Sequence, residues 1–276
     1  MNNIGIMQGR ILPKRLDRLQ LFPDRTWEEE LSKAKELGFS CVELLYDKEL
    51  VCRTMLSDNK RSGRLWEYLN KEMRRVVFKS TCLDYFTGIS LLDRKSFFCS
   101  EIVAIIEELK KSSIKIFVLP FFDENMIHSQ DEFRQVLQIL QDNNLDCLAR
   151  SNDVALALEL CLPAHQVRNS MDAYAFTNIK ICYDTGNARA SGYIPEEEII
   201  ELSGLIGHVH IKDRNVGGPN VPLGSGAVNF NACLEALQRI RYDGLMILET
   251  IYTDNPILDA RNNFAYLQGL LGRMVS

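Results

Sequence analysis

The sequence predicts an α/β fold, a single (β/α)8 TIM barrel that occupies residues 1–276 as one domain. Eight short apolar runs recur along the chain, helix-like segments lie between them, and no Gly/Ser-rich linker or change of composition divides the chain. The runs begin roughly every 25 to 40 residues, which is the spacing of a barrel of about 250 residues. A two-domain, doubly wound sheet is the alternative, and the unbroken composition argues against it.

The apolar runs are nearly continuous instead of alternating with polar residues, which is typical of parallel strands covered by helices. We expect strands within residues 3–10, 41–47, 76–85, 114–122, 154–160, 179–187, 206–213 and 245–250. Apolar residues at helical spacing predict helices at 26–39, 96–111, 131–144, 194–202, 229–240 and 258–274. Thr26 is the expected N-cap of the first helix, Gly38 its expected stop, and Pro195 stands at the first position of the fourth.

Composition and charge are those of an ordinary globular chain, with 46% hydrophobic and 25% charged residues. A formal net charge of -5 leaves no basic footprint for a polyanion, so we expect no nucleic-acid partner. No apolar run approaches the roughly 20 residues that span a bilayer, and the first residues lack the pattern of a signal peptide. The eight cysteines form no CxxC pair, which favours free thiols in a reducing compartment. We therefore expect a cytoplasmic protein without a membrane partner.

In a TIM barrel the site is built at the carboxyl ends of the strands. Polar and ionisable residues stand at most of these ends: Gln8, Arg10, Glu43, Asp47, Asp84, Glu159, Asp184, Asn187, His208, His210, Lys212, Asp213 and Glu249. Four of them, on the last four strands, would converge on one mouth: Glu159, Asp184, His210 and Glu249. Three crowded carboxylates repel one another unless a cation neutralises them. With one imidazole they suit Mn²⁺, Zn²⁺, Co²⁺ or Mg²⁺, so we expect one divalent metal ion.

Simpler roles remain open for two of these four residues. Glu159 can pair with Lys180 or with an arginine, and Asp184 can accept a hydrogen bond within its own turn. Gly186 is expected to let the backbone turn close beside Asp184.

The sequence HVH contains two histidines separated by one residue, His208 and His210. We interpret them as lying on opposite faces of the strand, with His210 facing the barrel interior as the metal ligand. His208 is then either packed or close to the substrate. Glu43, at the end of the second strand, either binds substrate or pairs with a lysine of the barrel.

The motifs YDTGN, GHVHIKD, VPLGSG and YDGLMILET resemble the sugar-phosphate isomerase/epimerase group of xylose isomerase-like TIM barrels. That group is related to the ketose 3-epimerases and to the type 2 apurinic endonucleases. The segments GIMQGRILP, VELLYD and STCLDYF also resemble it, so the resemblance covers nearly the whole chain. Each motif is weak alone, and their order and spacing together are specific.

The resemblance implies that one divalent metal is held by Glu159, Asp184, His210 and Glu249. It also implies that Glu159 and Glu249 act as the acid and base. The expected function is a metal-dependent sugar or sugar-phosphate isomerase or epimerase, manganese being one candidate metal. Its reaction is proton abstraction next to a carbonyl through a metal-stabilised enediolate. The expected partner is a small carbohydrate or its phosphate, and relatives suggest a homodimer.

Substrate contacts are predicted at Gln8, Arg10, Glu43, Asp84, Asn187, His208, Lys212 and Arg214. Lys212 and Arg214 are placed to hold a hydroxyl, a carboxylate or a phosphate. The loop at 216–226, VGGPNVPLGSG, supplies backbone amides that commonly meet an anion, unless its glycines serve only to turn the chain.

Three departures from the ketose epimerases leave the metal set intact but affect the substrate. Asn187 stands where some relatives have a histidine, and His165 stands where the ketose epimerases have a second glutamate. The relatives have an arginine shortly after the HxH motif; in this chain it is displaced, and Arg214 is the nearest candidate. These changes predict a specificity unlike that of the free-ketose 3-epimerases.

Three other functions remain as alternatives. An inosose-type sugar or cyclitol dehydratase uses the same metal and base to eliminate water. A non-catalytic sugar-binding barrel is expected to lose one of the acid/base carboxylates, and neither is missing here. An apurinic endonuclease needs a three-metal cluster and more barrel histidines than the four in this chain.

Overall fold

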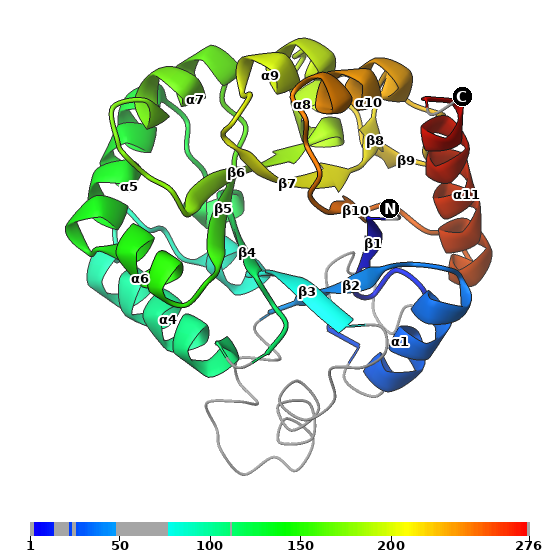
Figure 1. Cartoon of the computed structure of the whole chain (residues 1–276), viewed down its shortest axis with the longest axis horizontal. Helices are drawn as coiled ribbons and strands as arrows, with labels where there is room; N and C mark the ends of the chain where they lie inside the picture. The colour runs from blue at the N-terminus through cyan, green and yellow to red at the C-terminus, as the bar shows by residue number, and fades with distance from the viewer. Residues whose placement is uncertain (1–2, 14–21, 24–25, 48–76, 111, 275–276) are drawn as a thin grey trace.

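The computed structural model describes residues 3–13, 22–23, 26–47, 77–110 and 112–274. Eight parallel strands of these residues close into a barrel in the order β1-β10-β7-β6-β5-β4-β3-β2, with helices around the outside (Figure 1). The strands are β1 (Ile4–Met7), β2 (Cys41–Leu45), β3 (Val77–Cys82), β4 (Ile116–Pro120), β5 (Ala155–Glu159), β6 (Ile179–Asp184), β7 (Ile206–Ile211) and β10 (Met246–Leu248). Each lies within a predicted run, and the predicted TIM barrel is confirmed.

The helices are α1 (Trp27–Glu36), α4 (Lys95–Leu109), α5 (Gln130–Asp142), α6 (Leu145–Ser151), α7 (Ala164–Met171), α8 (Thr185–Ala190), α9 (Pro195–Glu201), α10 (Phe230–Arg239) and α11 (Pro256–Met274). Six were predicted, whereas α6, α7 and α8 were not. These three have only six to eight residues, too few for a helical period to stand out in sequence.

Short elements complete the connections between strands and helices. They are the 3-10 helices η1 (Asp84–Gly88) and η2 (Asp123–Asn125) and the hairpin of β8 (Asp213–Arg214) with β9 (Asn220–Val221). Gly38 follows α1 with φ at +94°, as a C-terminal stop requires. Thr26 occupies the N-cap position but its side chain makes no capping hydrogen bond, so that prediction was only half right.

The barrel interior is lined by small and medium side chains. Buried there, apart from the larger core between strands and helices, are Met7, Cys41, Leu45, Cys82, Val118, Ala157, Cys182, Leu245 and Ile247. Three of these are thiols and one is alanine, whereas bulky branched residues usually dominate a TIM-barrel interior. The small residues leave room for the polar side chains that share the interior with them. The seven described cysteines are free, and Cys52 lies outside the described residues.

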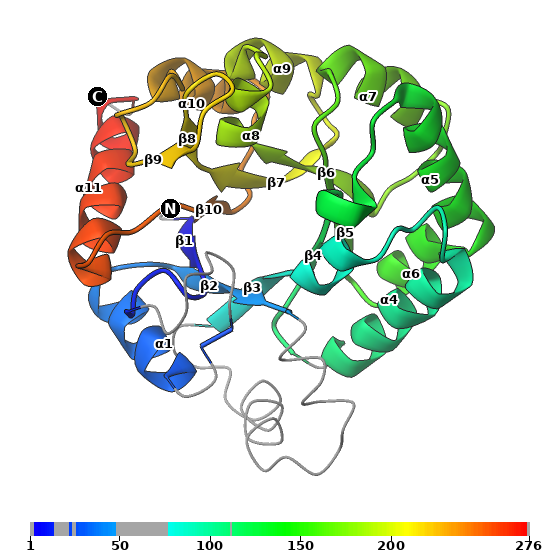
Figure 2. The ribbon, with the colours of Figure 1, turned by 180° about the vertical axis from the view of Figure 1, so that it is seen from behind.

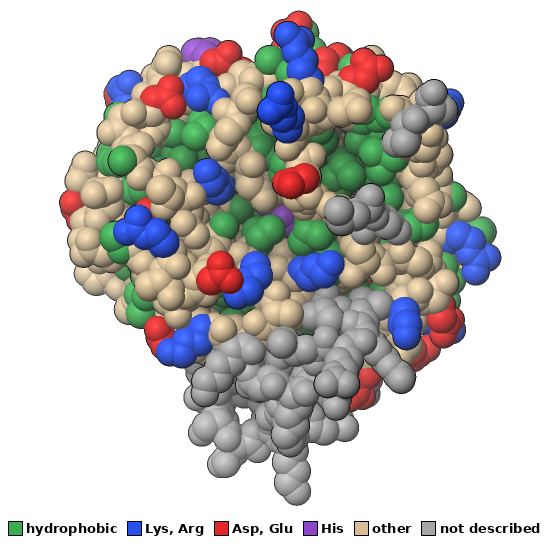
Figure 3. All heavy atoms as spheres, viewed as in Figure 1, with side chains coloured by type: hydrophobic (Ala, Val, Ile, Leu, Met, Phe, Trp, Pro, Cys, Tyr) green, Lys and Arg blue, Asp and Glu red, His purple; other side chains and the backbone are tan. Residues whose placement is uncertain are grey.

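The two ends of the barrel differ. Figure 3 shows the face at which the strands begin, where hydrophobic side chains fill most of the centre and charged side chains of both signs lie around it. Figure 2 looks onto the opposite face, which carries the β8–β9 hairpin. Within the described ranges, no helix has the length and hydropathy to cross a bilayer.

Gly5 and Gly269 give opposite predictions for replacement by alanine. A Cβ at Gly5 would lie 2.5 Å from Ile247 Cδ1 and 2.6 Å from Cys41 Sγ, so Gly5→Ala should lower the free energy of unfolding by about 1–3 kcal/mol. Gly269 lies inside α11 with nothing within 4 Å of such a Cβ. Gly269→Ala should therefore raise the free energy of unfolding by about 0.5–1 kcal/mol. Urea denaturation measures the free energy of unfolding of both variants. The same change in both would contradict this view of the interior.

Candidate functional site

Four side chains from consecutive strands of the barrel meet at one point. Glu159 ends β5, Asp184 ends β6, His210 lies in β7, and Glu249 directly follows β10. One ligand atom from each lies within 4.8 Å of all the others, and all four residues are buried. The strand register causes this convergence, since Asp184 is directly opposite His210. The structure thus brings together the four residues that the sequence singled out.

The donor atoms of this group fit a divalent cation. The Nδ1 of His210 lies 3.1 Å from Glu249 Oε2 and 3.6 Å from Glu159 Oε2. That Nδ1 is buried, and its contacts with the two carboxylates do not have the geometry of hydrogen bonds. A buried nitrogen without a partner is costly unless something else occupies its lone pair. A metal ion facing His210 Nδ1 and the carboxylate oxygens meets this requirement.

The remaining carboxylate oxygens are held by the protein itself. The backbone N–H of Asn187 donates to Asp184 Oδ1 at 2.7 Å, and the side-chain amide of Asn187 donates to Glu159 Oε1 at 3.3 Å. The first bond makes Asp184 the N-cap of α8, so the turn-binding role left open for Asp184 is present. It uses only one of the two oxygens. Lys180, which the sequence offered as a partner for Glu159, instead donates to the carbonyl of Gly204.

Lys212 supplies a buried cation beside two of the carboxylates. Its Nζ lies 3.0 Å from Asp184 Oδ2 and 3.0 Å from Glu249 Oε1. Burial opposes its charge, but Asp184 and Glu249 together raise the pKa of Lys212, so the ammonium stays charged. Gly186 makes room for it, because a Cβ there would lie 2.8 Å from Lys212 Cγ. Gly186 does not have a positive φ. The expected turn was therefore the wrong reason for this glycine.

His208 and His210 lie on the same face of β7, which corrects the expectation that they would point apart. Side chains two residues apart in a strand share a face. Both Nε2 atoms contact Glu43, at 2.6 Å from His208 and 2.8 Å from His210. Glu43 is therefore paired with imidazoles, neither with a lysine nor with substrate. Burial raises the pKa of Glu43, but the two histidines outweigh it and hold the pKa below its usual value.

A pocket of about 440 Å³, the mouth pocket, opens at two of the four side chains, Glu159 and Glu249. It is lined by Cys82, Asp84, Thr87, Pro120, Phe122, Asp123, Glu159, Asn187, Lys212, Arg214, Asn220 and Glu249. Its size suits a small ligand. Of the predicted substrate contacts, four belong to this lining: Asp84, Asn187, Lys212 and Arg214.

The other four predicted substrate contacts need correction: Gln8, Arg10, Glu43 and His208. All four are at most 1% exposed and none lines the mouth pocket. Gln8 accepts a hydrogen bond from the backbone of Leu45, and Arg10 lies 3.8 Å from Glu249. A residue near a strand end in sequence can thus lie below the pocket without lining it. These residues contact the backbone and the side chains of the site below the mouth pocket.

The matching family model, described as the xylose isomerase-like TIM barrel, covers residues 31–270. This chain belongs to that family. L-ribulose-5-phosphate 3-epimerase UlaE of Salmonella typhi is 29% identical over 238 residues, which is 81% of each chain.

Two solved structures share the fold. The 3-keto-D-glucoside 4-epimerase YcjR of E. coli has a TM-score of 0.68 at 20% identity and covers 98% of this chain and 100% of its own. The zinc-bound IolI protein has a TM-score of 0.72 at 18% identity and covers 99% and 98%. The curated relative is named as an epimerase, which is an isomerase-class enzyme.

The loop at 216–226 of this xylose isomerase-like barrel does not offer the free amides predicted for it. Asp213 Oδ2 accepts from the backbone N–H groups of Gly224 and Gly226, and its Oδ1 accepts from Val228. A Cβ at Gly226 would lie 2.2 Å from Asp213 Oδ1. These amides are consumed in shaping the loop. The cation that the loop region presents to the mouth pocket is Arg214, which also donates to Asn187 Oδ1 at 3.0 Å.

The carboxyl groups around the mouth pocket lie in different electrostatic environments. Burial raises the pKa of Glu159. Burial also acts on Glu249, but Lys212 outweighs it and holds the pKa of Glu249 below its usual value. Across the pocket, burial and the charge of Asp47 raise the pKa of Asp84 to about 6. Such divergent environments are typical of sites that perform acid/base chemistry.

Two buried residues near the site escaped the sequence reasoning. Glu30 of α1 is completely buried and accepts from the backbone N–H groups of Gly9 and Ile11, so it shapes the loop that carries Arg10. Glu30 follows two exposed glutamates on the same helix, so the sequence did not distinguish it from them. Cys182 lies within reach of His210 and Glu159, but burial raises the pKa of its thiol and keeps it protonated.

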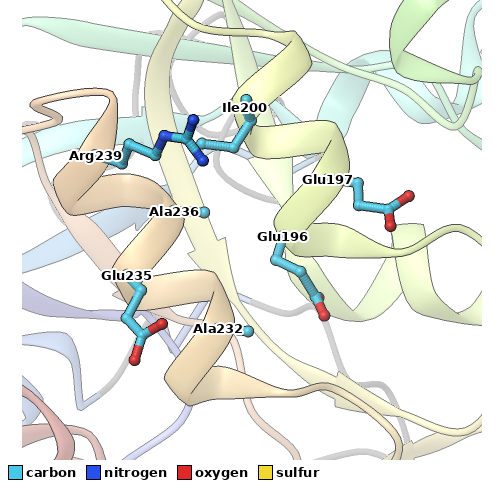
Figure 4. A pocket seen from close by; sticks show the side chains of 7 residues that line it. All are labelled: Glu196, Glu197, Ile200, Ala232, Glu235, Ala236 and Arg239. Atoms are coloured by element: carbon cyan, nitrogen blue, oxygen red, sulfur yellow. The ribbon is translucent and has the colours of Figure 1, made fainter.

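A second hollow of about 490 Å³ lies on the outside of the barrel between α9 and α10 (Figure 4). Three glutamates, two alanines, Ile200 and Arg239 line it. It is slightly larger than the mouth pocket but contains no histidine or cysteine among its lining residues, and it is remote from the strand ends. Size alone therefore does not make it the site of chemistry.

We expect Gly186→Ala to displace Lys212, because the new Cβ would overlap the lysine stem. The free energy of unfolding should fall by about 1–3 kcal/mol. Lys212→Ala removes the stem, so adding it to Gly186→Ala should cost less than the sum of the two single changes. Urea denaturation of the four proteins measures this coupling. Strict additivity would show that Gly186 and Lys212 are independent.

Glu30→Gln should flatten the dependence of stability on pH. Burial raises the pKa of Glu30 to about 7, above the ordinary value of 4.5. Its contribution to stability is therefore complete below pH 4.5 and is lost as the pH rises through 7, about 2–3 kcal/mol between pH 5 and 8. The variant should lack this decline in denaturation experiments. Glu29→Gln, on the exposed face of α1, is the control and should match the wild type.

Proposed function

We propose that this protein is a divalent-metal-dependent sugar or sugar-phosphate epimerase or isomerase that works by proton abstraction next to a carbonyl. That it is an isomerase-class enzyme follows from the epimerases to which it is related. The metal, the reaction steps and the roles of individual residues are the proposal. It is supported above all by the meeting of Glu159, Asp184, His210 and Glu249 within 4.8 Å, directly below the mouth pocket.

The chemistry requires help because a proton next to a carbonyl is too weakly acidic to leave unaided. A divalent ion held by the four residues would polarise the carbonyl and hydroxyl oxygens and stabilise the charge that develops on them. Of the two glutamates, one removes the proton from the substrate carbon. The other returns a proton to the opposite face, which is epimerisation, or to the neighbouring carbon, which is isomerisation.

The protein orients these two glutamates from opposite sides. Asn187 holds one oxygen of Glu159, and Lys212 holds one oxygen of Glu249. Each glutamate keeps its second oxygen toward His210. The bases are therefore aligned before substrate arrives, which lowers the entropy that the reaction must lose.

The substrate is proposed to be a small ketose or its phosphate. UlaE is named for a pentulose phosphate, and the mouth pocket presents Arg214 and Lys212 to a ligand. Asp84 and Thr87 lie on the pocket wall and are suited to bind sugar hydroxyls. Manganese, zinc, cobalt and magnesium all fit an oxygen-rich set with one imidazole.

Metal analysis combined with proton exchange tests this function. Wild type purified without chelator should contain about one equivalent of divalent metal, and Glu249→Gln and His210→Ala should lose most of it. In deuterated water, wild type should exchange the proton next to the carbonyl of a ketose or ketose phosphate. Glu159→Gln should slow this exchange by about 10²–10⁴-fold.

Glu198→Gln is the matched control, since Glu198 is a half-buried carboxylate that bonds the backbone of Ala164 outside the mouth pocket. It should keep both the metal and the exchange. Wild type that stays metal-free after soaking in Mn²⁺ would rule out the proposed mechanism. Wild type that holds metal but exchanges no proton in a broad panel of ketoses would rule out the proposed reaction.

A further inference from the structure

We propose that Glu43 is a positioning residue that holds both imidazoles of β7 in the tautomer with the proton on Nε2. His210 then presents the lone pair of Nδ1 to the metal position. The inference rests on the metal site of the proposed function, but not on the identity of the substrate. It gives a role to a carboxylate that lies below the mouth pocket without lining it.

The geometry allows few other arrangements. Glu43, His208 and His210 are each 0% exposed. Oε2 of Glu43 lies 2.6 Å from Nε2 of His208, and Oε1 lies 2.8 Å from Nε2 of His210. The two rings are 5.2 Å apart and nearly perpendicular, so one carboxylate reaches both with separate oxygens. Both oxygens of Glu43 are thus engaged, each with one imidazole.

The hydrogen bonds determine where the protons lie. An ionised carboxylate can only accept hydrogen bonds, so each Nε2 that contacts it must carry the proton. In a neutral imidazole the other nitrogen, Nδ1, is then a bare lone pair. For His210 this atom lies 3.1 Å from Glu249 Oε2 and 3.6 Å from Glu159 Oε2, on the side where the carboxylates converge. The tautomer required for metal binding is therefore imposed from the opposite side of the ring.

His208 is needed because Glu43 has two oxygens to satisfy. A buried carboxylate with only one partner would keep an unpaired oxygen in an apolar interior, which is costly. Of the two residues opposite Glu43 in the adjacent strands, Met7 has no donor, and the buried hydroxyl of Ser80 makes no hydrogen bond. The second imidazole fixes the rotation of the carboxylate, and that rotation fixes the ring plane of His210.

Ring-nitrogen NMR tests the tautomer directly. Zn²⁺-loaded protein with ¹⁵N-labelled histidine has only four imidazoles, and His128 and His165 are exposed. In wild type we expect protons on Nε2 of both buried histidines, slow to exchange with water, and zinc on Nδ1 of His210. Zinc on Nε2 of His210, or a proton on its Nδ1, would overturn the inference without any variant.

Glu43→Gln tests the consequence for metal binding. An amide offers one acceptor and one donor, so both imidazoles cannot keep the Nε2 proton. In either orientation of the amide, His210 loses its anionic partner or its tautomer. Zn²⁺ affinity, measured by competition with a chromophoric chelator, should fall about 10–100-fold. Unchanged affinity with unchanged tautomers in a folded variant would overturn the inference.

Two further variants separate positioning from packing. Ser80→Ala alters a fully buried side chain opposite Glu43 in the neighbouring strand, and its Oγ has no hydrogen-bond partner in the described structure. It should leave the affinity and both tautomers unchanged. His208→Gln keeps a donor for Glu43 and should retain most of the affinity. Equal losses in Ser80→Ala and Glu43→Gln would assign the effect to packing and overturn the inference.

These readouts remain informative if the proposed function fails. A protein that turns over no ketose but shows the expected tautomers and a weakened Glu43→Gln variant would disprove the reaction and support the role of Glu43. If instead wild type exchanges substrate protons and the Glu43→Gln variant binds Zn²⁺ as tightly as wild type, the reaction is supported and the role of Glu43 is disproved.

Discussion

The carboxylate of Glu43 between two imidazoles at the centre of the barrel is the interaction on which the site depends. A charge with no exposure to water survives only with full hydrogen bonding, and here His208 and His210 provide it. Two imidazoles and a carboxylate also need space. The small residues of the barrel interior, with Cys182 and Ala157 among them, provide that space where bulkier side chains would collide.

The carboxylates at the strand ends, nearer the mouth pocket, are also held in place by neighbouring residues. Glu159, Asp184 and Glu249 are each held through one oxygen by a neighbouring residue, and Glu159 and Glu249 turn the other oxygen toward His210. The anchors are Asn187 for Asp184 and Glu159, and Lys212 for Glu249. Thr185 joins the same two loops, since its hydroxyl donates to the carbonyl of Lys212. Neighbouring strand ends and the loops that follow them thus bind one another across the mouth of the barrel.

Polar residues near strand ends therefore divide into two groups by depth. Those that line the mouth pocket, such as Asp84 and Arg214, are open to a molecule that enters it. Those below it, such as Gln8 and Glu43, bond the backbone or the imidazole of His210. Glu30 extends the supporting group as far as α1, where it holds the loop that carries Arg10. Replacing a residue of the lower group would thus alter the site without touching the substrate.

The sequence alone was sufficient for the barrel, its eight strands and the four convergent residues, because strand order and parallel direction bring every strand end to one mouth. It could not show how deeply a residue is buried or what its side chain meets. Only the tertiary structure placed His208 beside His210 on Glu43, turned Asp213 into the anchor of its loop, and showed that Gly186 yields its space to Lys212. Spacing along a strand determines the face and the end, whereas contacts between strands distant in sequence determine the depth and the partner.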